Sequence, residues 1–574
     1  MSRIAVRVAL AFAVACAPLA GAGAANARRP RVLYVAATAK PSGTGSRRSP
    51  FDSLAAVERA SRPGDQIVVL PSPAAVAPLT GGIALKPRQT LMGAGPSVLG
   101  PGRPAALPRI DNLSAAHVHG DAVELASATT VRNLVIGPAY RGGAYGSNVG
   151  GVTVRGVDLS ATNSSCTTGF VVQPFKLPTL VPGVSVPFSS GLPNGWAAIM
   201  VDESRGAEKL RFDGNYVHDE SCADGIDVRA SGIARVAVEA SRNTATRLHQ
   251  GASQQSVLAI GMQTTGTALL AARLDQNTET YIGSALIGDL GVADSEGLFA
   301  NSAGRSRLTE TVDHNTFAHG LGHLSANCFE VVSSSGGPTM DVRLARSTCD
   351  HVVGDVLEAV NLSQAATMNF AIDQVRAADS EFIAGPVFHQ VEPGDDGDCL
   401  FELAAGAASS TSVTVTNSVL TGCVTDGLEV AAAVDDGHGA VRRLAFDVRG
   451  SRIAGNTLSN LRIANSSPVT VLDGRVERSD LSGTPGVPVI LENLDTSALT
   501  HERLDFGGGS LGSTGGNCIF GGATVLDIAD VRHQVSARGD WWGRPAGPGL
   551  GGVVAVGASV DSSEPLARAP VGTC

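Results

Sequence analysis

Two stretches one hundred residues apart share a pattern: residues 212–217 read Phe-Asp-Gly-Asn-Tyr-Val, and residues 312–317 read Val-Asp-His-Asn-Thr-Phe. In both, an apolar residue is followed three positions later by Asn and five positions later by a second apolar residue. Short Val-, Ile- and Leu-rich runs separated by Gly, Asn, Asp and Ser are typical of strands joined by tight turns. The pattern recurs, with Asn, Ser or an apolar residue at its fourth position, at Val131/Leu134/Ile136, Val154/Val157/Leu159, Val415/Ser418/Leu420, Val448/Ser451/Ile453 and Val476/Ser479/Leu481.

The spacing of these copies predicts a coil of stacked strands. Several successive copies lie 23 to 33 residues apart, a period typical of a solenoid that stacks its rungs about 4.8 Å apart and buries its apolar positions in one column. Asn or Ser at the fourth position would lie at an inward bend and hydrogen-bond from rung to rung. A β-sandwich or propeller is the alternative, but those folds seldom keep one pattern at one period for so many copies.

Composition narrows the class of protein. The 574 residues are 43% hydrophobic and 17% charged, which excludes a disordered chain. The formal net charge of −10 argues against a nucleic-acid partner, because such a partner needs a basic face. Length does not require several globular domains, since a solenoid grows by adding rungs. We expect a monomer.

The first 27 residues predict a secretory signal peptide. A basic start is followed by an apolar run over residues 8–15 and by Ala-x-Ala sites at residues 22–24 and 25–27. Cys16 leaves open lipidation of the chain, although the residues before it match a lipoprotein acceptor poorly. No later segment has the ~18 uninterrupted apolar residues of a membrane helix. We therefore expect a secreted protein that is extracellular, periplasmic or at the cell surface.

Eight cysteines follow this segment, an even number that predicts disulfides in an exported chain. Cys328 and Cys349 are 21 residues apart, and Cys399 and Cys423 are 24 residues apart, about one rung of a β-solenoid. These are the first pairs that we expect; the other four are Cys166, Cys222, Cys518 and Cys574.

Both ends of the chain resemble a known superfamily. Residues 33–94, with Pro-Gly-Asp-Gln-Ile-Val-Val-Leu at 63–70, are similar to the N-terminal cap and first rungs of secreted pectin-lyase-like β-helix proteins. Residues 540–548, Asp-Trp-Trp-Gly-Arg-Pro-Ala-Gly-Pro, resemble their closing motif, with Asp in place of Asn. The resemblance implies an all-β fold, a right-handed parallel β-helix. It would consist of a cap and first rungs (28–104), a helix (105–536) with a Pro-rich loop at 173–196, and a C-terminal cap (537–574) in which the two Trp rings close the core.

A second repeat, an acid between two apolar residues, predicts a column of carboxylates. Because neighbours in a strand alternate faces, an acid flanked by buried residues points outward, and stacking aligns such acids. Another acid or amide often lies three residues before the repeated acid. The simpler interpretation of this earlier residue is that it forms an Asp-Gly turn at the entry to the strand. The repeated acids are Glu124, Asp227, Glu330, Glu358, Glu402 and Glu429, and the earlier residues are Asp121, Asp224, Asn327, Asp355 and Asp426.

The outer column has two interpretations. Like charges one rung apart repel unless a cation or cationic ligand lies between them. Two carboxyls on adjacent rungs would be separated by nearly the ~5 Å of a retaining glycosidase pair, and two carboxyls from neighbouring columns by the ~6.5–9.5 Å of an inverting pair. Glu330/Glu358 and Glu402/Glu429 are the expected adjacent pairs, and with Asp227 they are the candidate catalytic acids. Alternatively, the acids form a solvated face that prevents aggregation.

The superfamily resemblance also implies a cation. Residues 218–227 resemble the Asp-Gly-Ile-Asp segment of calcium-dependent pectate lyases, so Asp219, Asp224 and Asp227 are candidate calcium ligands. Residues 394–399, Gly-Asp-Asp-Gly-Asp-Cys, resemble the Gly-Asp-Asp-Cys of polygalacturonases with two residues inserted. No lysine follows Lys209, which departs from lyases that use a lysine base. His314, His319 and His323 lie on loop and strand, where we expect ordinary surface histidines.

Two functions fit these patterns. The first is an exported β-helix protein that binds, and cleaves as a lyase or glycoside hydrolase, an extracellular polysaccharide along an acidic parallel sheet. The second is a non-catalytic surface or adhesion module, since the enzyme motifs are incomplete. The sequence contains no Gly-x-Ser-x-Gly, P-loop or Cys-x-x-Cys unit, so it does not support serine-hydrolase, nucleotide or zinc-ribbon chemistry.

Overall fold

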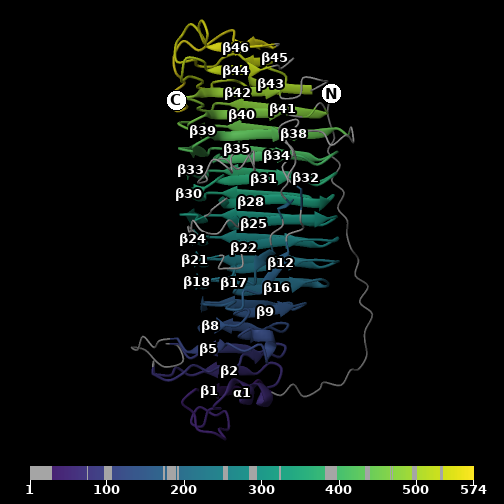
Figure 1. The fold of residues 1–574 in the computed structure, drawn as a ribbon, viewed down its shortest axis with the longest axis vertical. Coiled ribbons are helices and arrows are strands. Elements are labelled where there is room, and N and C mark those ends of the chain that lie inside the picture. The colour runs from purple at the N-terminus through teal and green to yellow at the C-terminus, as the bar shows by residue number, and fades with distance from the viewer. Residues whose placement is uncertain are drawn as a thin grey trace.

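The chain forms one long column of stacked rungs, with the N-terminal strands at one end and the C-terminal strands at the other (Figure 1). The computed structural model describes residues 29–73, 75–95, 107–171, 175–176, 189–190, 193–249, 256–283, 294–321, 325–381, 397–433, 440–465, 467, 469–493, 501–529, 534–556 and 558–574. The predicted signal peptide, Cys16 and His323 lie outside these residues, as does most of the predicted loop at 173–196.

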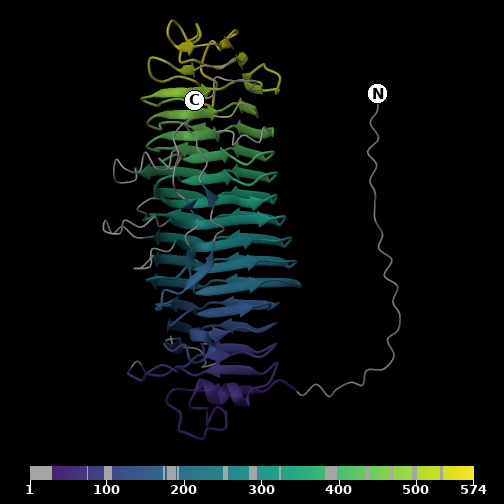
Figure 2. The same cartoon turned by 45° about the vertical axis from the view of Figure 1, so that its right-hand side comes forward.

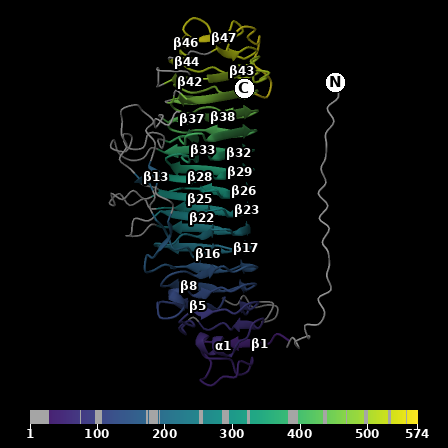
Figure 3. The same ribbon diagram turned by 90° about the vertical axis from the view of Figure 1, so that its right-hand side faces the viewer.

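In the middle of the coil, each turn adds one strand to each of three parallel sheets. In one turn the chain passes through β17 (Ala207–Asp213), β18 (Tyr216–Glu220) and β19 (Ile226–Ala230) before β20 (Arg235–Ser241) pairs in parallel with β17. Figure 2 shows the rungs stacked along the column, and Figure 3 shows two of the sheets side by side. The predicted right-handed parallel β-helix is confirmed.

The three sheets are numbered in the order of β17, β18 and β19 in this turn. Sheet 1 contains β1 (Val32–Val35), β2 (Gln66–Val69), β4 (Thr90–Gly93), β7 (Thr130–Arg132), β10 (Val152–Arg155), β17, β20, β23 (Leu269–Asp275), β26 (Arg307–Asp313), β29 (Thr339–Ala345), β32 (Thr367–Asp373), β35 (Ser410–Thr416), β38 (Arg442–Arg449), β41 (Thr470–Glu477), β43 (His501–Gly507), β45 (Gln534–Ala537) and β47 (Ser559–Asp561). Sheet 2 contains β5 (Arg109–Asn112), β8 (Val135–Ala139), β11 (Asp158–Ser160), β18, β21 (Thr244–Leu248), β24 (Thr278–Ile282), β27 (Thr316–Ala318), β30 (Thr348–Val353), β33 (Arg376–Glu381), β36 (Val419–Thr421) and β39 (Arg452–Ile453). Sheet 3 contains β3 (Ile83–Ala84), β6 (Val123–Glu124), β9 (Ala144–Ser147), β16 (Ile199–Glu203), β19, β22 (Val257–Thr264), β25 (Asp294–Gly304), β28 (Ser325–Gly336), β31 (Leu357–Asn361), β34 (Leu400–Ala404), β37 (Asp426–Ala432), β40 (Ser459–Asn465), β42 (Val487–Asn493), β44 (Leu526–Ala529) and β46 (Val553–Ala555).

A few short elements lie outside the three sheets. The helices are α1 (Leu54–Ala60), which buries Leu54 and Val57 near the N-terminal end, and the single 3-10 turn η1 (Val118–Gly120). Two antiparallel pairs join β12 (Thr168–Val171) to β15 (Pro193–Gly195) and β13 (Phe175–Lys176) to β14 (Ser189–Ser190). Among the described residues, neither helix is long and apolar enough to cross a membrane.

The predicted polar ladder runs through the bend between sheets 1 and 2. The backbone N–H and the side-chain amide of Asn215 donate to Oδ1 of Asn243 at 3.1 and 2.9 Å. Asn243 donates in the same way to Asn277, and the N–H of Asn277 donates to Oδ1 of Asn315 at 2.7 Å. These side chains are at most 4% exposed. The ladder thus gives buried backbone N–H groups an acceptor one rung away, which confirms the role predicted for the fourth position.

Serines continue the ladder toward the C-terminal end, where Asp540 completes it. The N–H of Ser479 donates to Oδ1 of Asn517, and the N–H of Asn517 donates to Oδ1 of Asp540, both at 2.9 Å. Burial raises the pKa of Asp540 to about 8. The adjacent Trp542 is 3% exposed and packs on the core.

Four disulfides link neighbouring parts of the coil. The two predicted pairs, Cys328–Cys349 and Cys399–Cys423, are confirmed. Cys166–Cys222 joins two rungs near β12, and Cys518–Cys574 ties the end of the chain back to an earlier rung.

The apolar interior also holds acids that no sequence pattern predicted. Glu310 is in register with Ala272 and Val342, and Glu279 is in register with Ala245 and Phe317, so both face the core. Among the described residues, neither carboxyl has a hydrogen-bond partner. Burial raises the pKa of both, to about 8 for Glu310.

Replacing Asn277 with Ala should lower the free energy of unfolding by about 1–3 kcal/mol, because the buried N–H of Asn243 loses its acceptor. Denaturant unfolding followed by circular dichroism measures the change. Asn369→Ala removes an exposed Asn whose amide donates to Asp341, and should have a much smaller effect. An equal loss of unfolding free energy in the two variants would contradict the stabilising role of the ladder.

Glu310→Gln should change how stability depends on pH. Since the pKa of Glu310 is higher in the folded chain than its ordinary value of 4.5, the native state binds more protons between pH 4.5 and about 8, and stability falls as the pH rises through this window. The variant should match the wild type near pH 4.5 and exceed it by on the order of 3–5 kcal/mol above pH 8. Unfolding free energies at pH 5 and 8.5 test this, with exposed Glu239→Gln as the control.

Candidate functional site: the outer face of sheet 3

One row of side chains on the outer face of sheet 3 carries most of the predicted acids. Strand register places Asp227 beside Gly261, Phe299 beside Glu330, Glu330 beside Glu358, and Phe401 beside Glu429. The alignment predicted for Asp227, Glu330, Glu358 and Glu429 is therefore confirmed. This row, called the outer row below, consists of Glu124, Tyr145, Met200, Asp227, Gly261, Phe299, Glu330, Glu358, Phe401, Glu429 and Arg462.

The placement predicted for Glu402 is wrong. Phe401 occupies the outer row on β34, while Glu402 is in register with Ala359 and Val430, which belong to the core. Glu402 is fully buried, and burial raises its pKa well above the usual range. Hence Glu402 and Glu429 are not a pair in register, and the second adjacent-rung pair expected from sequence is absent.

Buried aspartates set this register. The carboxylate of Asp355 accepts the N–H of Asp398 at 2.6 Å, and that of Asp398 accepts the N–H of Asp426 at 2.8 Å. Asp224 likewise accepts the N–H of Leu258 at 3.0 Å. Each aspartate fixes the entry into the next strand of sheet 3, as turn chemistry predicts. Asp398 lies three residues before Phe401, and this spacing was a signal, unused in the prediction, that Phe401 and not Glu402 is the outer residue.

The three predicted calcium ligands do not come together. Asp219 lies on β18 of sheet 2, where it pairs with Arg247 at 2.5 Å and with His218 at 2.6 Å. These hydrogen bonds, led by that from Arg247, lower its pKa well below the usual range. Asp224 and Asp227 are instead buried beside sheet 3. The site predicted from residues 218–227 is therefore corrected to a pair of carboxyls.

Asp224 and Asp227 form a buried carboxyl pair. Both side chains are fully buried, and the amide of Asn194 donates to Oδ2 of Asp227 at 3.2 Å. Burial raises the pKa of both groups, and the charge of Asp227 raises that of Asp224 further. The two carboxyls therefore titrate as a coupled pair and not as independent groups.

A second group of carboxyls lies farther along the same face. Asp398, Asp426 and Glu429 each place one carboxylate oxygen within 4.8 Å of the others. Arg462, one rung beyond, lies 3.7 Å from Oδ2 of Asp426 and 3.6 Å from Oε2 of Glu429. Oxygen-only donors are those that calcium prefers. In this group the guanidinium of Arg462 already supplies part of the positive charge that compensates the carboxylates.

Glu330 and Glu358 are the adjacent acids in the middle of the outer row. Glu330 is 7% exposed, and Glu358 accepts a hydrogen bond at Oε2 from the amide of Asn327 at 2.8 Å. An apolar strip containing Phe299, Val332 and Val360 runs beside them on the same face. The face therefore pairs a line of carboxyls with a strip suited to the apolar side of a ligand.

Sequence reasoning missed an aromatic group at the N-terminal end of this face. The ring centroids of Tyr145 and Trp196 are 5.1 Å apart, and the guanidinium of Arg141 lies 4.1 Å from the Trp196 ring centroid. Arg229 lies 4.3 Å from the Phe170 ring centroid in the same way. Trp196 is the only tryptophan outside the C-terminal motif, and that isolation was the available signal.

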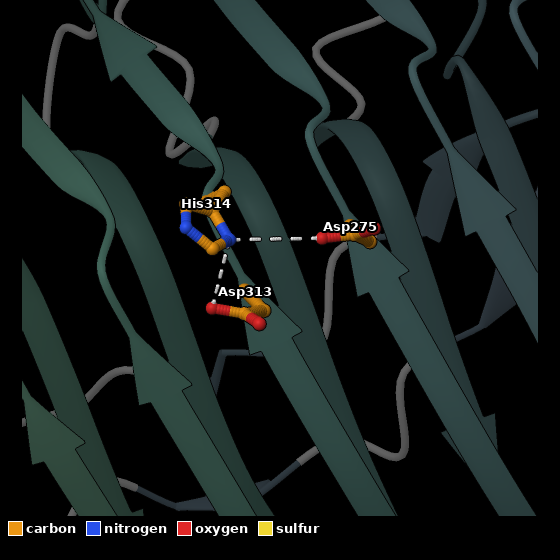
Figure 4. A group of neighbouring side chains, drawn as sticks. All are labelled: Asp275, Asp313 and His314. Atoms are coloured by element: carbon orange, nitrogen blue, oxygen red, sulfur yellow. Dashed lines mark ion pairs between the residues drawn. The ribbon is translucent and has the colours of Figure 1, made fainter.

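A separate acid–histidine cluster lies at the edge of sheet 1 (Figure 4). Nδ1 of His314 is 3.2 Å from Asp313 and 3.9 Å from Asp275, which come from neighbouring strands. Arg346 also pairs with Asp313. The acids of this edge are thus neutralised by protein groups.

Comparisons with known proteins identify no family. No protein-family model and no curated protein match the chain. Similar solved structures include a rhamnogalacturonan lyase (10% identity, TM-score 0.28, 67% of this chain and 82% of that chain). Others are the A-module of mannuronan C-5 epimerase AlgE4 from Azotobacter vinelandii (11%, 0.27, 90% and 94%) and pectate lyase Pel9A (12%, 0.23, 81% and 78%). Identities this low transfer no activity to this chain.

Proposed function

We propose that this protein is exported and that it binds and cleaves an extracellular polysaccharide along the outer face of sheet 3. The observation that carries the proposal is the register of Glu330 with Glu358 on adjacent rungs. Strand spacing separates their backbones by about 4.8 Å, which suits two carboxyls acting on one bond. Four disulfides fit an oxidising compartment. The resemblance of residues 33–94 and 540–548 to secreted pectin-lyase-like proteins supports the same substrate class.

The proposal assigns one role to each acid. Glu358, which accepts the hydrogen bond from Asn327 at Oε2, acts as the nucleophile or base. Glu330 then acts as the acid: it protonates the glycosidic oxygen while Glu358 attacks the anomeric carbon, and water later hydrolyses the glycosyl ester. The adjacent apolar strip with Phe299 would contact the apolar face of a sugar ring. A carboxyl spacing near ~5 Å is that of a retaining hydrolase.

The group of Asp398, Asp426 and Glu429 favours a second candidate, a calcium-assisted lyase. An acidic face repels a polyuronate unless a cation bridges the two, and this group provides carboxylate donors for calcium. Calcium bound there would neutralise a uronate carboxylate next to the pair of acids. A neutral glycan needs no such cation, so the two candidates differ in their calcium requirement.

Wild-type protein screened against neutral and anionic polysaccharides should release reducing ends from a neutral glycan equally well with calcium or with chelator. Release of unsaturated sugars from a polyuronate, lost with chelator, would support the lyase instead. Binding without turnover of any glycan would contradict catalysis and favour the adhesion module.

Glu330→Gln and Glu358→Gln should each lower kcat by about 10²–10⁴-fold on the glycan that the screen identifies, because each removes an acid, base or nucleophile from the reaction. Binding of that glycan should change little. Glu124→Gln is the matched control, since Glu124 is an exposed acid of the same row many rungs away. Unchanged turnover in a folded Glu330→Gln/Glu358→Gln variant would overturn the proposal.

A further inference from the structure

A column of residues with left-handed backbone runs along the outer surface of sheet 2. Tyr281, His319, His351 and Asp379 have φ values between +55° and +59°, on the successive strands β24, β27, β30 and β33 or directly after them. Between β30 and β33 the register is unchanged from Asp350↔Ala378 to Val352↔Ser380, so the left-handed residues His351 and Asp379 lie opposite each other. Left-handed backbone at a residue other than glycine is uncommon and clusters at functional sites.

The stacked left-handed residues bring two imidazoles and two carboxylates together. The ring centroids of His319 and His351 are 5.2 Å apart, and Nδ1 of His351 lies 2.9 Å from Oδ1 of Asp350. Asp350, His351 and Asp379 each have a potential ligand atom within 4.8 Å of the other two. Tyr281 stacks on His319 at 5.1 Å and supports it from the preceding rung.

The cluster is open on one side. His351 is half exposed, so an ion can reach it from solvent. On the next rung, a Cβ at Gly422 would lie 2.4 Å from Oδ1 of Asp379, so the glycine leaves this carboxylate room. Arg376 lies 3.5 Å from Oδ2 of Asp379, and this one cation faces two carboxylates.

The acid–histidine cluster at the edge of sheet 1 differs from the sheet 2 cluster in its number of imidazoles and in its arginine pairing. Asp275, Asp313 and His314 supply a single imidazole, and Arg346 pairs directly with the nearly buried carboxylate of Asp313 (Figure 4). The sheet 2 cluster has a second imidazole, and within the described part of the chain no arginine pairs with Asp350. A mixed set of imidazole nitrogens and carboxylate oxygens is typical of zinc and similar divalent metals rather than of calcium.

We propose that His319, Asp350, His351 and Asp379 form a zinc site on sheet 2. Zinc is four-coordinate with ligand bonds of about 2.0–2.2 Å, so the four side chains would rotate toward the ion from their present separations. The ion would link β30 and β33 to the residue that follows β27, and would stabilise this part of the coil by binding only the folded chain. The site lies on a different sheet from the outer row, so it does not depend on the proposed function.

Isothermal titration of zinc chloride into untagged, chelator-treated full-length protein should show one site that is weakened in His351→Ala. Loss of an outer-shell partner alone costs about 10–100-fold in metal affinity, so loss of a direct ligand should cost at least as much. His314→Ala, in the arginine-neutralised cluster, should bind zinc like the wild type. Zinc should also raise the Tm of the wild type and of His314→Ala, but not that of His351→Ala.

Absence of zinc binding by the wild type, or equal affinity in the wild type and His351→Ala, would overturn the proposal. Should His351→Ala fail to fold by circular dichroism, Asp379→Asn provides the same comparison with a near-isosteric change. Retained wild-type affinity in folded Asp379→Asn would equally contradict Asp379 as a ligand. Glycan turnover is not a readout of this experiment, so its outcome is separate from that of the polysaccharide screen.

Discussion

The structure depends on hydrogen bonds that connect each rung to the next through buried polar side chains. Parallel strands alone allow a rung to slip along its neighbour, and a slip of one residue would exchange the inner and outer faces. The asparagine–serine ladder between sheets 1 and 2 and the aspartates before sheet 3 give buried N–H groups an acceptor at only one register. The positions of all outward side chains follow from this constraint.

The aspartate ladder explains the chemistry of the outer face. Asp355 fixes the start of one strand by binding the N–H of Asp398, and the acid three residues after Asp355, Glu358, then lies beside Glu330. The same spacing places Phe401 in the row and turns Glu402 into the core. The structural carboxyls are those that accept a backbone N–H of the next rung, and the candidate functional acids follow three residues later on the strand.

Left-handed residues have the corresponding role on sheet 2. A strand with strict alternation would point Asp350 and His351 to opposite faces, whereas the left-handed residue lets both remain near the surface. Repetition of the left-handed residue on successive strands gathers side chains that are about thirty residues apart in the chain. Neither His319 nor His351 belongs to a recognisable sequence motif, because the grouping arises from stacking.

The sequence by itself determined the coil, its polar ladder, two disulfides and the outer row through Asp227, Glu330, Glu358 and Glu429, because each depends on a local pattern repeated at a regular period. Only the tertiary structure decided that Glu402 is buried, that Asp219 pairs with Arg247, and that Trp196 joins Tyr145. These outcomes depend on the lengths of the turns between strands, which vary from rung to rung and set which residues of distant segments meet. A local pattern determines on which face of a sheet a side chain lies, whereas the register of the next rung determines which side chains lie beside it.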